Sequence, residues 1–287
     1  MQRTHKTKNL ILTVAALIFI ACTVLFEILP IRYTSDEKAN GFIENILPLG
    51  FGCIAVACML IKNGSKIWGK PQKLWYMLPC LLIAVDNFQF PAYFAGKMSL
   101  TYTDGKYFVL FALHCICVGL FEEGIFRGVL FALFAGTFSK DKKGFLKTYI
   151  LSSVVFGATH ILNVFGGAGV PATLLQVVYT TLTGGLFAFA FIKTKNIFIA
   201  AFAHAVYNFC GLLFSESGLG AGAILDTPTV IMMTLVCVPI GAFVLYKVWK
   251  YPEEERIELY ARLGFGVKPI DSKQDEKTDE NSVCENK

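Results

Sequence analysis

The sequence predicts an all-α, polytopic membrane protein, and three observations lead to this prediction. The 287 residues are 55% apolar and only 16% charged, with a mean hydropathy of +0.56, whereas a soluble domain carries about 25% charged residues. The apolar residues are grouped into long blocks, as membrane-spanning helices require. The basic residues are concentrated in alternate segments between these blocks. The composition therefore excludes a soluble protein with a large core.

Eight apolar blocks are candidate transmembrane helices. They are residues 10–29, 42–61, 74–95, 107–137, 146–162, 171–192, 197–214 and 228–249. The third block contains Pro79 and Pro91, which interrupt a regular helix unless they lie in a first turn. The fifth block is the shortest of the eight.

The distribution of Lys and Arg predicts the orientation of these spans. If the N-terminus is cytoplasmic and every block crosses the bilayer, the cytoplasmic segments hold 21 of the 26 basic residues and the outer loops hold four. The remaining one, Arg127, lies inside a block. Such an excess on one side is the positive-inside pattern, so we expect both termini in the cytoplasm. It also explains the net charge of +5 without a nucleic-acid partner.

The domain organisation follows from a change of composition near residue 250. Residues 1–250 are predicted to form a single transmembrane domain, and residues 251–287 a cytoplasmic tail. The tail begins with a segment from Pro252 to Leu263 whose pattern is typical of a short amphipathic helix on the membrane surface. Beyond about Ile270, its Lys, Asp, Glu, Asn and Ser residues predict disorder.

Three charged residues, Glu122, Glu123 and Arg127, lie within the apolar block 107–137. Each costs about 2.5–3.5 kcal/mol at the centre of a membrane helix, so ionisable residues at this depth indicate a functional site. Glu123 and Arg127 are four residues apart, a spacing that favours an ion pair on one helix face. Glu122 is rotated by about 100° from Glu123 and is free to face another helix.

Further polar residues occupy other apolar blocks. His160 closes one of them, and His204 and Asn208, four residues apart, share a face of another. His114 lies on the same block as the glutamates but points away from them, and we interpret it as structural or interfacial. For Asp86 two interpretations stay open, a supporting role near the site or a water-facing position.

These residue types together are suited to the hydrolysis of an amide bond. A carboxylate beside an imidazole can activate water as a general base, and a second imidazole with an amide can stabilise an oxyanion. Alternatively, Glu122, His160 and His204 could bind a Zn²⁺ that activates the water. The chain contains no HExxH motif. Residue types alone do not separate the metal-free mechanism from the zinc-dependent one.

Three segments resemble the three motifs of the CAAX prenyl protease type II and bacteriocin-processing family of intramembrane proteases, called CPBP or Abi. They are Glu122-Glu123-x-x-x-Arg127, Phe156-x-x-x-His160 and His204-x-x-x-Asn208. Their order, spacing and placement on separate apolar helices agree, and the resemblance covers about residues 107–214. Eight spans also fit this family.

The resemblance implies an intramembrane endopeptidase and a role for each motif residue. Glu122 would be the general base, with His160 as its partner. His204 and Asn208 would stabilise the oxyanion, and Glu123 and Arg127 would form the ion pair that orients the site. The family is commonly labelled a metalloprotease, but we favour the metal-free version, so no cofactor is firmly implied beyond an optional Zn²⁺.

The expected partners are the lipid bilayer and a peptide or lipidated protein, prenylated in some members of the family. The Lys- and Ile-rich composition favours a bacterial cell membrane as the location. Two other classes of function remain as alternatives. A proton-coupled transporter would also keep ionisable residues in the membrane, but it predicts an internal repeat, which we do not find. A non-catalytic immunity or scaffold protein predicts tolerance of Glu122→Gln.

Overall fold

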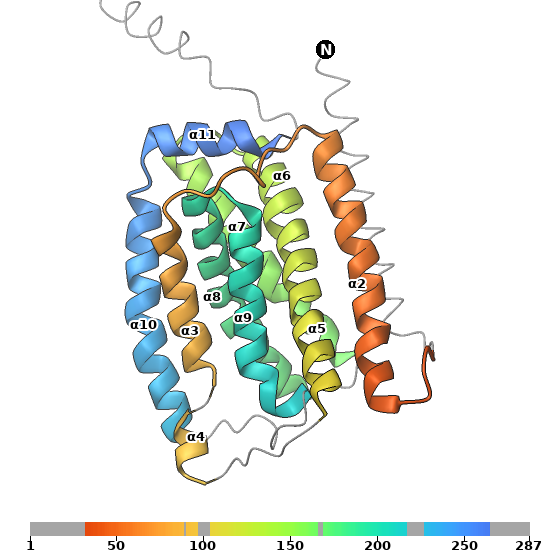
Figure 1. Ribbon diagram of the computed structural model, residues 1–287. Helices are drawn as coiled ribbons and strands as arrows, with labels where there is room; N and C mark the ends of the chain where they lie inside the picture. The colour runs from red at the N-terminus through yellow and green to blue at the C-terminus, as the bar shows by residue number, and fades with distance from the viewer. Residues whose placement is uncertain (1–31, 89, 97–103, 166–168, 217–226, 265–287) are drawn as a thin grey trace, which may run out of the picture.

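The computed structural model describes residues 32–88, 90–96, 104–165, 169–216 and 227–264, and all its elements in these ranges are helices. This confirms the all-α prediction. The long helices are α2 (Glu37–Lys62), α5 (Gly105–Glu123), α7 (Lys142–Thr159), α8 (Val170–Thr194), α9 (Ile197–Glu216) and α10 (Thr227–Trp249). The shorter elements are η1 (Leu74–Met77), α3 (Leu78–Asp86), α4 (Phe90–Phe94), η2 (Gly124–Leu130), α6 (Phe131–Thr137), η3 (His160–Val164) and α11 (Glu253–Leu263). The long helices stand side by side, and α11 lies across one end of the bundle (Figure 1).

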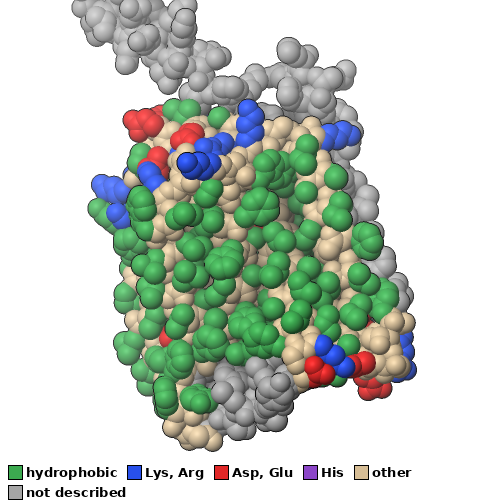
Figure 2. Space-filling view, in the orientation of Figure 1, with side chains coloured by type: hydrophobic (Ala, Val, Ile, Leu, Met, Phe, Trp, Pro, Cys, Tyr) green, Lys and Arg blue, Asp and Glu red, His purple; other side chains and the backbone are tan. Residues whose placement is uncertain are grey.

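The surface and the helix lengths both indicate a protein embedded in lipid. Among the described residues, four helical stretches are long and apolar enough to cross a bilayer, at residues 37–62, 105–137, 142–164 and 173–194, and α9 and α10 contain shorter apolar stretches. Hydrophobic side chains cover the middle of the face in Figure 2, whereas charged side chains gather toward its two ends. The protein is a multi-pass integral membrane protein. The expected first span, residues 10–29, lies outside the described residues.

The expected span 74–95 is not one continuous helix in the structure. The helix α3 ends at Asp86, and α4 begins anew at Phe90. The two prolines explain the division, because Pro79 and Pro91 each lie in the first turn of a helix, where the missing backbone N–H costs nothing. The prolines therefore start two helices here instead of kinking one.

Two glutamates of α11 form ion pairs with lysines from other segments at the same end of the bundle. Lys73 Nζ lies 2.5 Å and Lys193 Nζ 3.2 Å from the carboxylate of Glu255, while Lys195 pairs with Glu258. Burial raises the pKa of Glu255, but the hydrogen bonds and charges of Lys73 and Lys193 outweigh this effect and lower it. The loop before α3 and the α8–α9 turn are thus tied to one helix.

Small residues let the helices that carry the polar residues approach closely. A Cβ atom added to Gly119 on α5 would lie 2.5 Å from the carbonyl oxygen of Ala201 and 3.1 Å from the backbone nitrogen of Ala205, both on α9. One added to Gly157 on α7 would lie 2.0 Å from the hydroxyl of Thr181 on α8. In lipid, such close contacts between small residues drive helix association.

We expect Gly119→Ala to separate α5 from α9 and to destabilise the protein by about 1–3 kcal/mol, the usual cost of overpacking. Thermal unfolding in detergent measures this effect. Gly50→Ala on α2 is the matched control, because an added Cβ at Gly50 meets nothing within 4 Å. Equal melting temperatures for the two variants would contradict the close approach of α5 and α9.

Candidate active site

The segment that carries the charged residues changes its helical form at the site. The helix α5 ends at Glu123, and η2 continues as a π-helix before α6 begins. The sequence predicts an uninterrupted helix over this segment, and no residue pattern in it signals the wider turn. Such π-helical turns are rare and occur frequently at functional sites.

Glu123 and Arg127 form an ion pair whose two side chains are fully buried. Arg127 Nη1 donates to Glu123 Oε1 at 2.9 Å, and Nη2 donates to the carbonyl oxygen of Gly184 on α8 at 2.5 Å. The guanidinium lies 4.5 Å from the ring centroid of Phe156 on α7. Gly184 leaves room for this arrangement, because an added Cβ would lie 2.6 Å from the Phe156 ring. Arg127 therefore holds η2, α7 and α8 together.

His204 on α9 lies between the carboxylates of two consecutive residues. Its Nδ1 is 3.0 Å from Glu123 Oε1, and its Nε2 is 3.9 Å from Glu122 Oε2. The side chain of Glu122 is 28% exposed and that of Glu123 is fully buried. The sequence predicts that the two carboxylates diverge, but both reach His204 because they approach opposite edges of one ring. Of the two, only Glu122 has part of its side chain outside the packed interior.

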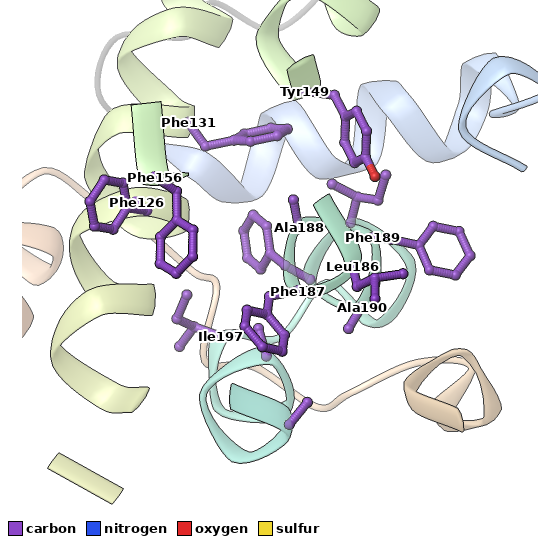
Figure 3. Packing of buried hydrophobic residues seen from close by; sticks show 14 of the residues in the cluster. Phe126, Phe131, Tyr149, Phe156, Leu186, Phe187, Ala188, Phe189, Ala190 and Ile197 are labelled. Atoms are coloured by element: carbon purple, nitrogen blue, oxygen red, sulfur yellow. The ribbon is translucent and has the colours of Figure 1, made fainter. Parts of the chain in front are cut away.

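Aromatic rings fix the orientation of the His204 ring. The ring of Phe187 on α8 stacks on it, with centroids 4.6 Å apart and an interplanar angle of 12°. Phe156 meets it edge-on at 5.7 Å. Figure 3 shows the rings of Phe126 and Phe156 beside each other, with Phe187 facing them from α8. The site is thus built into the main apolar core of the bundle.

His160 follows the last residue of α7, on the same side of the bundle as His204. Its Nδ1 lies 3.1 Å from the carbonyl oxygen of Phe156. Because a carbonyl oxygen only accepts, Nδ1 carries the proton and Nε2 is left as an acceptor. The Phe156 ring contacts both imidazoles, at 5.4 Å from His160 and 5.7 Å from His204. Within the described part of the chain, His160 forms no hydrogen bond or ion pair with Glu122.

Asn208, the last of the four expected catalytic residues, lies one turn beyond His204 on α9 and is half-buried. The geometry needed for a zinc site is not present among the described residues. No group of three His, Cys, Asp or Glu side chains is close enough there to hold a metal ion. Glu122, His160 and His204, the set expected for zinc, do not form such a group.

The two other polar residues singled out in the sequence lie apart from these contacts. The His114 ring packs 6.3 Å from the ring of Phe42 on α2, which places it at the α2–α5 contact, in line with its structural interpretation. Asp86 is 6% exposed, and its Oδ2 has no hydrogen-bond partner among the described residues. Its electrostatic neighbours are Tyr207 and Cys237, so it lies between α3, α9 and α10 and does not face bulk water.

We expect Asp86→Asn to be tolerated, with a gain of roughly 1 kcal/mol in the free energy of unfolding. The physical reason is that a buried carboxylate with an unpaired oxygen costs more than a neutral amide of the same shape. Thermal unfolding in detergent measures the change. A loss of stability would instead mean that the carboxylate of Asp86 has a favourable partner in the folded protein.

Sequence reasoning missed the residues that support the site from α8. Gly184 accepts the hydrogen bond from Arg127, and Phe187 stacks on His204. Phe156 was part of a motif, but its contact with both imidazoles was not foreseen. The one signal available was the pair Gly184-Gly185 within an apolar helix, which indicates a close approach of another element.

The part of the chain that contains these polar residues is similar to a known protein family. Residues 104–210 match the family model described as "Type II CAAX prenyl endopeptidase Rce1-like". Over these residues the chain is therefore similar to Rce1-like proteins, and we call residues 104–210 the Rce1-like segment. The segment contains Glu122, Glu123, Arg127, His160, His204 and Asn208, so it includes all three motifs. The resemblance inferred from the motifs is confirmed.

A bacterial protein is similar to part of the chain. The protein of Bacillus subtilis (strain 168) named "Putative membrane peptidase YdiL" is 33% identical over 90 residues. The alignment covers 31% of this chain and 30% of the relative, so the similarity spans less than a third of either protein. No solved structure matches the chain significantly. The similarity to Rce1-like proteins therefore rests on sequence.

Proposed function

We propose that the protein is an intramembrane endopeptidase of the CPBP type, which hydrolyses a peptide bond without a metal. One observation supports this most strongly: His204 lies between the carboxylates of Glu122 and Glu123, and Arg127 anchors that of Glu123 within the bundle. A carboxylate that water reaches, beside a fixed imidazole in a buried site, is the arrangement that general-base hydrolysis needs.

In the proposed reaction, Glu122 removes a proton from a water molecule while the water oxygen attacks the carbonyl carbon of the substrate. His160 assists through Nε2, since its Nδ1 is committed to the carbonyl of Phe156. The 3.9 Å between Glu122 and His204 exceeds a direct hydrogen bond and leaves room for a bridging water. His204 and Asn208 stabilise the oxyanion. Glu122 then returns the proton to the leaving nitrogen as the C–N bond breaks.

The proposal includes eight spans with both termini in the cytoplasm. In support, three basic segments between proposed spans meet at one end of the bundle around α11, through Lys73, Lys193 and the contact of Lys140 with the ring of Tyr260. The opposite end carries the pair of Lys106 with Asp36 at 2.8 Å. Residues 1–250 would form the membrane domain, with the catalytic core at about 107–214, and residues 251–287 the cytoplasmic tail.

The substrate class follows from the location of the site. A site at membrane depth takes a peptide segment that enters from lipid, either apolar or carrying a lipid, and prenylated proteins are the substrates that the family's name suggests. The bacterial relative favours a bacterial cell membrane, where unprenylated substrates are the more natural candidates. The cleaved peptide and any protein partner are to be identified with a library.

The test is proteolysis by the purified protein in liposomes, against lipidated and unlipidated peptides, with and without a chelator. We expect cleavage at a defined bond, unchanged by the chelator. Loss of cleavage with the chelator and its return with Zn²⁺ would favour the zinc-dependent mechanism. A folded wild-type protein that cleaves no peptide, together with a Glu122→Gln variant that keeps its biological activity, would favour the scaffold or immunity protein.

A further inference from the structure

We infer that Glu123 is a positioning residue for His204, in addition to being the ion-pair partner of Arg127. It holds the imidazole with a proton on Nδ1, so that Nε2 is the atom presented to Glu122 and to the substrate. This inference rests on the proposed function for its catalytic consequence, but the proton position itself can be measured without any activity.

The direction of the hydrogen bond follows from Arg127. Arginine is always protonated and has only donors, so Glu123 Oε1 accepts from Nη1 at 2.9 Å. The same oxygen lies 3.0 Å from Nδ1 of His204. An ionised carboxylate has only acceptors, so Nδ1 must be the donor in this contact. Glu123 thus accepts from two side chains that come from different helices.

The environment leaves the ring no alternative orientation. Phe187 stacks on one face of His204 at 4.6 Å, and Phe156 meets its edge. Turning the ring over would bring a carbon atom to Glu123 Oε1 and leave a buried carboxylate with one partner fewer. Glu123 Oε2 already has no partner among the described residues, so this cost would be added to an incompletely satisfied group.

The chemical consequence concerns the second nitrogen of His204. When Nε2 takes up the proton that Glu122 has removed from water, the ring becomes a cation and its Nε2–H donates to the oxyanion, until the proton returns through Glu122 to the leaving nitrogen. The carboxylate of Glu123, which is paired with Arg127, lies fully buried 3.0 Å from Nδ1 and stabilises this cation. The role corresponds to that of the aspartate in a Ser-His-Asp triad, which orients the histidine and does not touch the substrate.

Two variants separate this role from a structural one. Glu123→Met combined with Arg127→Met removes the acceptor and leaves no unpaired buried charge, so the bundle can remain folded. Glu123→Asp keeps a carboxylate on a shorter side chain. In a triad, replacing the aspartate by asparagine lowers kcat by about 10⁴-fold, and we expect the double variant to lower kcat by about 10²-fold or more. KM should change little, and Glu123→Asp should recover part of kcat.

The decisive readout is the ¹⁵N NMR spectrum of labelled imidazole side chains in detergent, with His204 assigned by comparison with His204→Gln. We expect the proton on Nδ1 in the wild type and its loss from Nδ1 in the double variant. A proton on Nε2 in the wild type, or an unchanged tautomer in the double variant, would overturn the inference. A wild type that cleaves nothing but shows the Nδ1 proton would refute the proposed function and leave the positioning role intact.

Discussion

Glu122→Gln is expected to lower kcat for peptide hydrolysis by about 10²–10⁴-fold, the range that a positioned general base contributes. The amide cannot accept a proton from water, yet it has nearly the shape of the carboxylate, so the fold is preserved. The rate is measured with the purified variant in liposomes, on the best peptide that the library yields.

The partial exposure of Glu122 makes this a sharp test of mechanism. Because its side chain is not sealed in the core, the change leaves no buried group without a partner, and the melting temperature should match that of the wild type. A variant that melts normally and cleaves at more than about a tenth of the wild-type rate would be outside the range for a general base. Glu122 would then not be that base.

Arg127→Ala is expected to destabilise the protein by about 3–5 kcal/mol, because it leaves the fully buried Glu123 without its counter-charge. It also removes the donor to the Gly184 carbonyl and the contact with the Phe156 ring. Equilibrium unfolding in mixed micelles, together with the folded yield after purification, measures the effect.

The double variant Glu123→Met with Arg127→Met provides the matched comparison for this prediction. Replacing both partners of a buried ion pair by apolar side chains is often neutral or stabilising, so stability should return toward that of the wild type. Activity should not return, because His204 has lost its acceptor. If Arg127→Ala alone unfolds no more easily than the wild type, the ion pair contributes nothing to the fold.

The helices of this fold could be predicted where a long run of apolar residues determines them. The apolar blocks coincide with α2, α5–α6, α7 and α8, because a long apolar run has no stable alternative in lipid. The division of block 74–95 into α3 and α4 depended on how Pro79 and Pro91 are used. The sequence shows where these prolines are, but it does not predict whether each one kinks a helix or begins one.

The sequence predicted which residues form the candidate site better than it predicted which of them contact one another. The spacing of Glu123 and Arg127 indicated their contact, and burial of charge in lipid required that they find partners. That both glutamates reach His204 could not be inferred, since it depends on how far α9 approaches α5 at Gly119. The support from Phe187 and Gly184 on α8 likewise depends on packing between helices distant in sequence.

The most direct test of the proposed site compares two carboxylates of the same bundle, Glu122 and Asp86. Both lie in helices of the membrane domain, but only Glu122 lies beside His204. Glu122→Gln and Asp86→Asn would be purified, matched for melting temperature and assayed side by side in liposomes. The account predicts that Asp86→Asn cleaves like the wild type and that Glu122→Gln is nearly inactive. Equal activity of the two variants would contradict it.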